Sequence, residues 1–244
     1  MIPKIIYQVS IGLNYNHPDA AKYITQTKTL NPDWQYILIT NEDDLDTFVN
    51  TNSFINTEFD KQIRKAYNNL NILVAKIDFW RYLILYKTGG VYFDLDSSIN
   101  KSLNDLINSY DEAIISAEGH PNMFVQWCLM FNSGHPILKK VIKNVTQNII
   151  GNVHPNDIHK MTGPTVFSFV IHEIHNKIFG HYVQHKLINK DTDIFIKTPD
   201  ITYRLYGVDY NGFLSFQFPE HKVLYQNKLH WRVEQQFKPL LKKQ

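Results

Sequence analysis

Two adjacent glycines, Gly89 and Gly90, separate two kinds of structure within one long apolar stretch of this chain. Val74 to Lys87 has the length and apolar content of a buried helix, and a glycine after it accommodates the left-handed conformation in which many helices end. Val91 to Asp94 is rich in the β-branched and aromatic side chains that are typical of strands. The chain therefore passes from helix to strand across the glycines, which favours a sheet covered by helices.

The residues before this stretch repeat the same alternation of strand and helix. We expect strands at Ile5–Val9 and Gln35–Thr40, and helices at Pro18–Leu30 and Phe59–Leu70. Asn41 is a candidate N-cap for a further short helix through residues 43–49. The resulting β-α-β-α-β order predicts an α/β fold with a mainly parallel sheet flanked by helices.

The second half of the chain is less regular. Strands are expected at Ala113–Ser116 and Phe124–Phe131, and helices at Pro136–Ile150 and Thr165–Ile178. Residues 194–225 are rich in β formers and turn residues, and their pattern does not show where individual strands begin and end. In that stretch the aromatic side chains between Tyr203 and Phe218 suit either the core or a platform for sugars. The change of pattern predicts a mixed second half.

Composition narrows the class of protein. Hydrophobic residues make up 43% of the 244 residues and charged residues 20%, which is typical of a globular chain. A net charge of +2 with no dense basic run argues against a nucleic-acid partner. Cys128 is a lone cysteine, expected in the core, and excludes an internal disulfide. No apolar run approaches a membrane span and no signal peptide is visible, so we expect a cytoplasmic protein.

Asp94 and Asp96 form the most chemically distinctive pair. On a strand they face one side, ~6–7 Å apart, near the carboxyl edge where α/β sheets bind ligands. Three interpretations remain open for them. They hold Mg²⁺ or Mn²⁺ together with a substrate phosphate, they form a solvated turn, or they are the nucleophile and acid/base of a phosphatase that resembles the haloacid dehalogenases.

Asp78 and Arg81 interrupt the apolar helix that precedes this pair. They are spaced i,i+3 and therefore neighbours on one helix face. A buried charge needs a partner. The two side chains therefore either satisfy each other or line a ligand pocket, and periodicity cannot choose between these alternatives.

Residues 75–99, AKIDFWRYLILYKTGGVYFDLDSSI, resemble the hallmark of glycosyltransferase family 32, the sugar transferases with a DXD motif. This family includes fungal outer-chain mannosyltransferases, and the catalytic domains of large glucosylating toxins are similar to it. Weaker similarity covers residues 1–45 and 120–170, including the motifs at residues 134–136 and 162–164. The matching positions of the hallmark are Ala75, Asp78, Arg81, Tyr82, Leu85, Tyr86, Gly89, Gly90, Tyr92, Asp94 and Asp96.

The resemblance implies a GT-A fold and a retaining hexosyltransferase that moves sugar from a UDP- or GDP-sugar to a hydroxyl acceptor, as in glycan or polysaccharide biosynthesis. The cofactor would be Mn²⁺ or Mg²⁺, and the acceptor a glycan or protein. Residues 1–244 would form a single domain. Its first half, to about residue 100, would bind the nucleotide-sugar, and the rest would bind the acceptor and supply a C-terminal closing segment.

The resemblance also assigns roles to single residues. Asp94 and Asp96 would be catalytic and hold the metal, with His230 as a further metal ligand. The donor and other substrate groups would contact Gln8, Ser10, Asn41, Asp78, Arg81, Tyr92 and Trp231.

Because of two departures from the family pattern, the resemblance does not decide whether the donor carries uridine or guanosine. Val9-Ser10 stands where the family often has a tryptophan, and Ile77 where it often has serine. A domain that binds sugar or nucleotide without turnover remains an alternative. His172 and His175 lack the spacing of zinc proteases, so we expect no zinc there.

Overall fold

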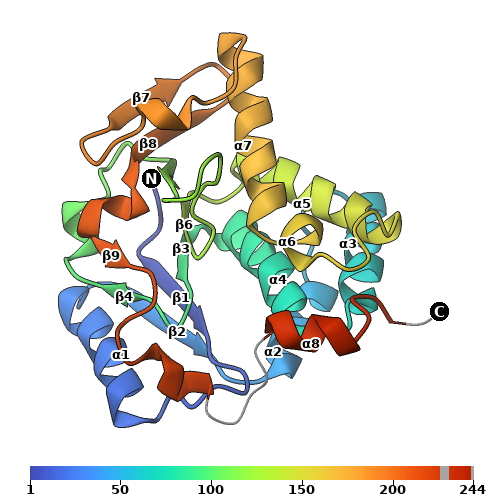
Figure 1. The fold of residues 1–244 in the computed structure, drawn as a ribbon. Coiled ribbons are helices and arrows are strands. Elements are labelled where there is room, and N and C mark those ends of the chain that lie inside the picture. The colour runs from blue at the N-terminus through green and yellow to red at the C-terminus, as the bar shows by residue number, and fades with distance from the viewer. Residues whose placement is uncertain (226–230, 243–244) are drawn as a thin grey trace.

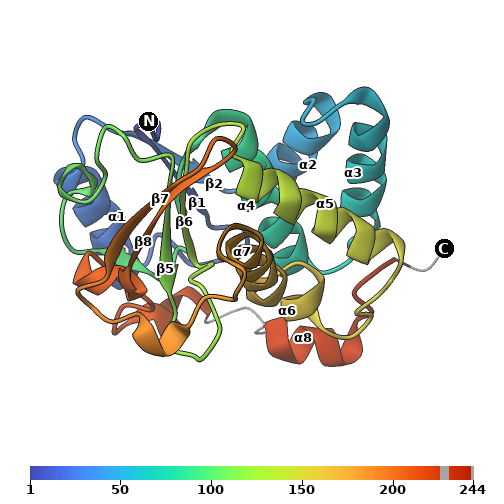
Figure 2. The same ribbon diagram turned by 90° about the horizontal axis from the view of Figure 1, so that it is seen from above.

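A seven-stranded sheet crosses the molecule, and helices cover it on both faces (Figures 1 and 2). The computed structural model describes residues 1–225 and 231–242. The strand order in the sheet is β2-β1-β3-β6-β5-β8-β7. Its strands are β1 (Ile5–Val9), β2 (Gln35–Ile39), β3 (Gly90–Phe93), β5 (Ala113–Ala117), β6 (Cys128–Phe131), β7 (Asp193–Lys197) and β8 (Thr202–Val208). A small separate sheet pairs β4 (Ser98–Ile99) with β9 (Leu214–Ser215).

Strand direction is mostly shared. β1 is parallel to β2 and β3, and β5 is parallel to β8, whereas β6 is antiparallel to both β3 and β5. β7 is antiparallel to β8. The strands other than β6 and β7 therefore run in one direction, which confirms the expected α/β fold with a mainly parallel sheet and a mixed second half. The carboxyl ends of β1, β3, β5 and β8 meet at one edge.

Helices lie on the two faces unequally. Figure 2 shows α1 on one face and the group of α2 to α7 on the other. Gly89 ends α4 with a positive φ of 69°, as expected of a glycine, but its ψ of −173° is extended and not that of the left-handed helical conformation. The helices are α1 (Pro18–Leu30), α2 (Glu42–Thr51), α3 (Thr57–Asn69), α4 (Leu73–Thr88), α5 (Pro136–Ile150), α6 (Ile158–Met161), α7 (Pro164–Phe179) and α8 (Trp231–Phe237).

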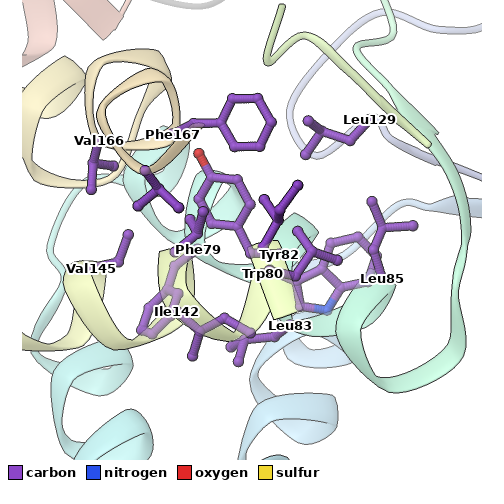
Figure 3. Close-up of a cluster of buried hydrophobic side chains, with 14 of the residues drawn as sticks. Phe79, Trp80, Tyr82, Leu83, Leu85, Leu129, Ile142, Val145, Val166 and Phe167 are labelled. Carbon is purple, nitrogen blue, oxygen red and sulfur yellow. The ribbon is translucent and has the colours of Figure 1, made fainter. Parts of the chain in front are cut away.

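The sheet separates two hydrophobic cores because successive strand residues point to opposite faces. On β3, Tyr92 packs into the larger core beneath α4, α5 and α7, while Val91 and Phe93 enter the smaller one. In the larger core the rings of Tyr82 and Phe167 stack with 6.2 Å between centroids (Figure 3). Cys128 is fully buried in the smaller core, as expected. Among the described residues, no helix has both the length and the apolar character needed to cross a bilayer.

Two local expectations are wrong. Phe124–Phe131 is not one strand, because only Cys128–Phe131 joins the sheet as β6 and Phe124 makes an isolated bridge with Ala117. Asp94 and Asp96 do not alternate along a strand either. β3 ends at Phe93, and the N–H of Ser97 donates to the carbonyl of Asp94 at 3.0 Å, which closes a turn.

Candidate active site

A cleft of about 870 Å³ opens at the carboxyl edge of the sheet. Its walls come from residues that follow β1, β3, β5 and β8, from the first turns of α4 and α7, and from the start of α8. This edge is where open α/β sheets place their ligands, because the loops after parallel strands converge there. The volume lies in the range of small-molecule and cofactor sites.

Asp94 is fixed at the centre of the cleft by its neighbours. The Tyr92 hydroxyl donates to its Oδ1 at 2.8 Å, and Nη2 of Arg81 lies 3.2 Å from the same oxygen. Nε2 of Gln8 donates to the backbone carbonyl of Asp94 at 3.3 Å. Since these side-chain contacts both fall on Oδ1, the carboxylate is oriented while its side chain stays 31% exposed.

The sequence left open whether Asp78 and Arg81 pair with each other or line a ligand pocket. In the structure they do both. Nη2 of Arg81 lies 3.1 Å from Oδ1 of Asp78. Gln126 completes the network: its Nε2 donates to Asp78 at 3.1 Å, and its Oε1 accepts from Arg81 at 3.0 Å. The Thr162 hydroxyl donates to Oδ2 of Asp78 at 3.1 Å. A side-chain amide suits this place because it offers a donor to the carboxylate and an acceptor to the guanidinium.

Asp96 lies on the turn after β3, 6% exposed. Its Oδ2 accepts hydrogen bonds from the Tyr225 hydroxyl at 3.0 Å and from Gln217 at 3.4 Å. Its Oδ1 is buried and has no hydrogen-bond partner in the part of the chain that the structure describes. A buried carboxylate oxygen without a partner is costly, and a bound cation would satisfy it.

The electrostatics of the pair follow from burial and from like charge. The pKa of Asp94 is raised to about 6, mainly by burial and in part by the nearby charge of Asp96, against the lowering effect of Arg81. Burial and the two carboxylates also raise the pKa of Tyr225, so its hydroxyl remains a donor.

The donor set fits a hard divalent cation held jointly by protein and substrate. No group of three or more histidine, cysteine, aspartate or glutamate side chains gathers for a metal within residues 1–225 and 231–242. Mg²⁺ and Mn²⁺ need no full protein cage, because one or two carboxylates suffice when substrate phosphates supply further oxygens. Asp94 and Asp96 match that arrangement.

The remaining predicted residues divide into three groups. Trp231 lines the cleft and packs against the ring of His159, with 5.3 Å between centroids. Gln8, Ser10 and Asn41 are not among the cleft-lining residues. Gln8 holds the backbone of Asp94, Ser10 donates to the carbonyl of Ile39, and Asn41 caps α2. Their substrate contacts stay predictions, and His230 lies outside the described residues.

Several residues that line the cleft were not predicted as site residues from the sequence. Glu118 and Asp209 follow β5 and β8 directly. For Glu118 the available signal was an acidic residue shortly after an expected strand, whereas no strand was expected before Asp209. Gln126 had no such signal, because the contacts that define it come from α4. The other newly found lining residues include His120, Met123, Trp127, His159, Thr165, Phe216, Gln217 and Tyr225.

Residues 18–113 match the family model described as a glycosyltransferase sugar-binding region containing a DXD motif. Among curated proteins, the chain is 27% identical over 149 residues to an initiation-specific alpha-1,6-mannosyltransferase of Candida albicans, covering 48% of this chain and 39% of that protein. A Schizosaccharomyces pombe protein of the same name is 25% identical, over 77% of this chain and 52% of its own length. The inositol phosphoceramide mannosyltransferase 3 of that yeast is 29% identical, over 69% of this chain and 44% of its own length.

The chain thus spans about half the length, or less, of these curated relatives. Among solved structures, the PaToxG glycosyltransferase superposes with a TM-score of 0.56 at 18% identity, covering 73% of this chain and 72% of that one. The ligand-free glycosyltransferase domain of the YGT toxin superposes with a TM-score of 0.50 at 11% identity, covering 74% of this chain and 79% of that one. These likenesses concern the fold, and together with the family match they confirm the expected resemblance to DXD sugar transferases.

Proposed function

We propose that this chain is a metal-dependent glycosyltransferase that moves a hexose from a UDP- or GDP-sugar to a hydroxyl acceptor. The observation that carries the proposal is the position of Asp94 and Asp96. Both lie after the inner strand β3, in one cleft with Asp78, Arg81 and Tyr92. In this proposal the first half of the chain binds the donor, and the second half supplies most of the acceptor wall.

One end of the cleft suits the nucleoside. It is lined by aliphatic side chains from the residues after β1 and from the first turns of α4, which offer apolar surface to a planar base. The transition from this apolar end to Asp94 and Asp96 matches a donor with a base at one end and a diphosphate at the other. The aliphatic residues are Val9, Ile11, Leu13, Leu73, Val74 and Ile77.

The metal would be held by Asp94, by Oδ1 of Asp96, which has no hydrogen-bond partner within residues 1–225 and 231–242, and by the donor diphosphate. When bound, it would neutralise the charge that develops on the departing diphosphate. The chain's own residues orient this arrangement: Arg81 and Tyr92 hold Oδ1 of Asp94, and Tyr225 holds Oδ2 of Asp96. Fixed groups of this kind need no reorganisation during the reaction.

The transfer breaks the bond between the anomeric carbon and the diphosphate oxygen, and that oxygen keeps the electron pair. The acceptor oxygen bonds to the anomeric carbon, and its proton passes to the departing diphosphate. Reaction on the same face of the sugar retains the anomeric configuration and requires no protein base. Trp231 would cover the donor and limit access of water.

The test is a panel of UDP- and GDP-sugars with Mn²⁺, followed by hydrolysis to water and by transfer to added disaccharides. We expect at least one donor to be turned over, with a loss of about 100-fold or more in Asp94→Asn and Asp96→Asn. Donor binding without turnover would instead support a binding domain. Release of phosphate from p-nitrophenyl phosphate that depends on Asp94, with no donor turned over, would support a phosphatase.

A further inference from the structure

The wall of the cleft beyond Asp96 carries two carboxylates that the proposed transfer does not use. Glu118 follows β5 and Asp209 follows β8, and these strands are neighbours, so both side chains reach the same wall. The backbone N–H of Gly119 donates to Asp209. Burial raises the pKa of Glu118, and the charge of the nearby Asp209 raises it as well.

An aromatic surface adjoins these acids. Phe216 is 51% exposed inside the cleft and packs on Trp127, with 5.5 Å between ring centroids. Trp127 also lines the cleft and is 5% exposed, so the two rings form one aromatic surface along this wall.

Side-chain contacts connect this wall to the reaction centre. Gln217 follows Phe216 and donates to Asp96 at 3.4 Å. Trp127 packs on Tyr210, the residue after Asp209, with 6.1 Å between centroids. A molecule lying on Phe216 would therefore have one end near Asp96 and the other near Glu118 and Asp209. This is the place for the acceptor rather than for the donor.

We infer that the acceptor is the uncharged end of a glycan, with a sugar ring on Phe216 and its hydroxyls donating to Glu118 and Asp209. The inference rests on the proposed function. Aromatic rings stack on the apolar faces of sugars, and carboxylates accept hydrogen bonds from adjacent hydroxyls. The same carboxylates repel an acceptor that carries a phosphate at this position, so charge excludes phosphorylated acceptors.

The other charged groups of the cleft do not reverse this preference. Arg81 is already engaged by Asp78 and Asp94, and Arg232 lies on α8 together with Glu234. His120 is near Glu118, and His159 packs against Trp231 at the side of α8. Glu118 and Asp209 follow the ends of β5 and β8 and line the same cleft as the exposed Phe216.

The experiment compares neutral disaccharides with the 6-phosphates of the same disaccharides. Binding is measured by saturation-transfer NMR without donor, and transfer is measured with the donor that the panel identifies. The wild-type chain should bind and use the neutral forms at least about tenfold better. Glu118→Gln combined with Asp209→Asn should narrow that ratio to within about threefold, because the repulsion is removed.

A matched control carries the same change of charge elsewhere. Glu58→Gln combined with Asp200→Asn alters exposed acids outside the cleft and should keep the wild-type ratio. Phe216→Ala should weaken neutral disaccharide binding about tenfold or more, and Phe216→Tyr should restore most of it.

The inference is overturned if the wild-type chain prefers or equally accepts the phosphorylated forms, if the acid variant keeps the wild-type ratio, or if no disaccharide binds. Hydrolysis of donor by the wild-type chain reports the proposed function separately, because it needs no sugar acceptor. A chain that turns over no donor would overturn the proposed function, while the binding comparison would still decide the nature of the wall.

Discussion

Nη2 of Arg81 lies 3.2 Å from Oδ1 of Asp94, although the two residues belong to a helix and to the turn after a strand. Gly89 and Gly90 make this contact possible, because the chain reverses there and β3 runs back along α4. The guanidinium is 3% exposed and also contacts Asp78 at 3.1 Å. A buried cation thus ties the first acid of the DXD motif to the helix before it.

Replacing Arg81 by lysine tests whether the geometry of this cation matters. Lysine keeps the charge but cannot contact Asp78, Asp94 and Gln126 together, because it lacks the planar fork. We expect donor affinity to fall at least about tenfold and the free energy of unfolding to fall by about 2–4 kcal/mol. Urea unfolding and donor titration on the same sample measure both quantities.

The matched control is Arg64→Lys on α3, where the guanidinium donates to backbone carbonyls of Asn50 and Asn52 away from the cleft. It should leave donor binding unchanged. If Arg81→Lys also binds donor normally, Arg81 serves stability alone.

Asp96→Asn tests the proposed metal site. In the wild-type chain, Mn²⁺ and UDP or GDP together should stabilise the fold more than the sum of their separate effects, because each completes the coordination of the other. A ligand at 100 times its Kd adds about 2.7 kcal/mol to the free energy of unfolding. Asp96→Asn should abolish the excess, as followed by thermal unfolding.

Asp105→Asn, an exposed acid on the short 3-10 helix Leu103–Asp105, is the control and should keep the excess stabilisation. Synergy that survives in Asp96→Asn would mean that another group holds the ion.

Gly89→Ala tests the turn between α4 and β3. Gly89 (φ 69°, ψ −173°) and Gly180 (φ 75°, ψ 6°) both have a positive φ, so alanine is strained at either position, and more so at Gly89, whose φ and ψ together are adopted almost only by glycine. At Gly89 a Cβ would also lie 2.7 Å from Pro3 and from the backbone nitrogen of Ser133, whereas at Gly180 it meets no described atom within 4 Å. We expect Gly89→Ala to cost about 1–3 kcal/mol more than Gly180→Ala in chemical unfolding. Equal costs would mean that the backbone at Gly89 and its neighbours Pro3 and Ser133 adjust without strain.

His135 predicts a pH dependence of stability. It is 2% exposed, its Nε2 contacts the carbonyl of Thr202 at 2.9 Å, and its Nδ1 accepts from the N–H of Ile137. Both contacts suit the neutral ring, and burial lowers the pKa of His135 to about 4. Because this lies below the ordinary value near 6.5, the unfolded chain takes up the proton first and stability falls as pH drops from about 6.5 towards 4.

The histidine should account for a loss of about 2 kcal/mol between pH 7 and pH 5. His135→Asn keeps a residue suited to cap α5 and should lose this part of the dependence. Urea unfolding of both chains at several pH values measures the difference in slope. Parallel curves would show that His135 is protonated in the folded state or that it opens to solvent.

Part of the fold could be predicted because its signals are local. The helices at Pro18–Leu30 and Pro136–Ile150 begin and end where expected, since each starts at a proline and is followed by a residue typical of turns, Asn31 or Gly151. The sequence did not decide whether Asp78 and Arg81 only pair with each other or also line a pocket. The answer depends on their contacts with Gln126 and Asp94, which the folding of the sheet brings close to α4. The sequence pattern carries no such long-range pairing.

The turn at Asp94 and Asp96 was missed for a related reason. Alternation along a strand assumes that pairing continues, whereas β3 ends at Phe93 and Asp96 turns towards the C-terminal segment to meet Tyr225. Within the stretch from Tyr203 to Phe218, Tyr203, Tyr210 and Phe218 proved to be core residues, and Phe216 alone of these four is largely exposed. Only tertiary packing distinguishes them.

The reversed strand β6 lies between β3 and β5, although it follows both in the chain. During synthesis on the ribosome, β3 and β5 therefore emerge before the strand that joins them, and each has an unpaired edge until Phe131 has been added. Exposed edges of this kind invite pairing with other chains. The insertion of β6 would then be the step that joins β2-β1-β3 to β5, before β8 and β7 complete the sheet. Substitutions that weaken Cys128–Phe131 should therefore slow folding and promote aggregation of new chains more than they destabilise the finished protein.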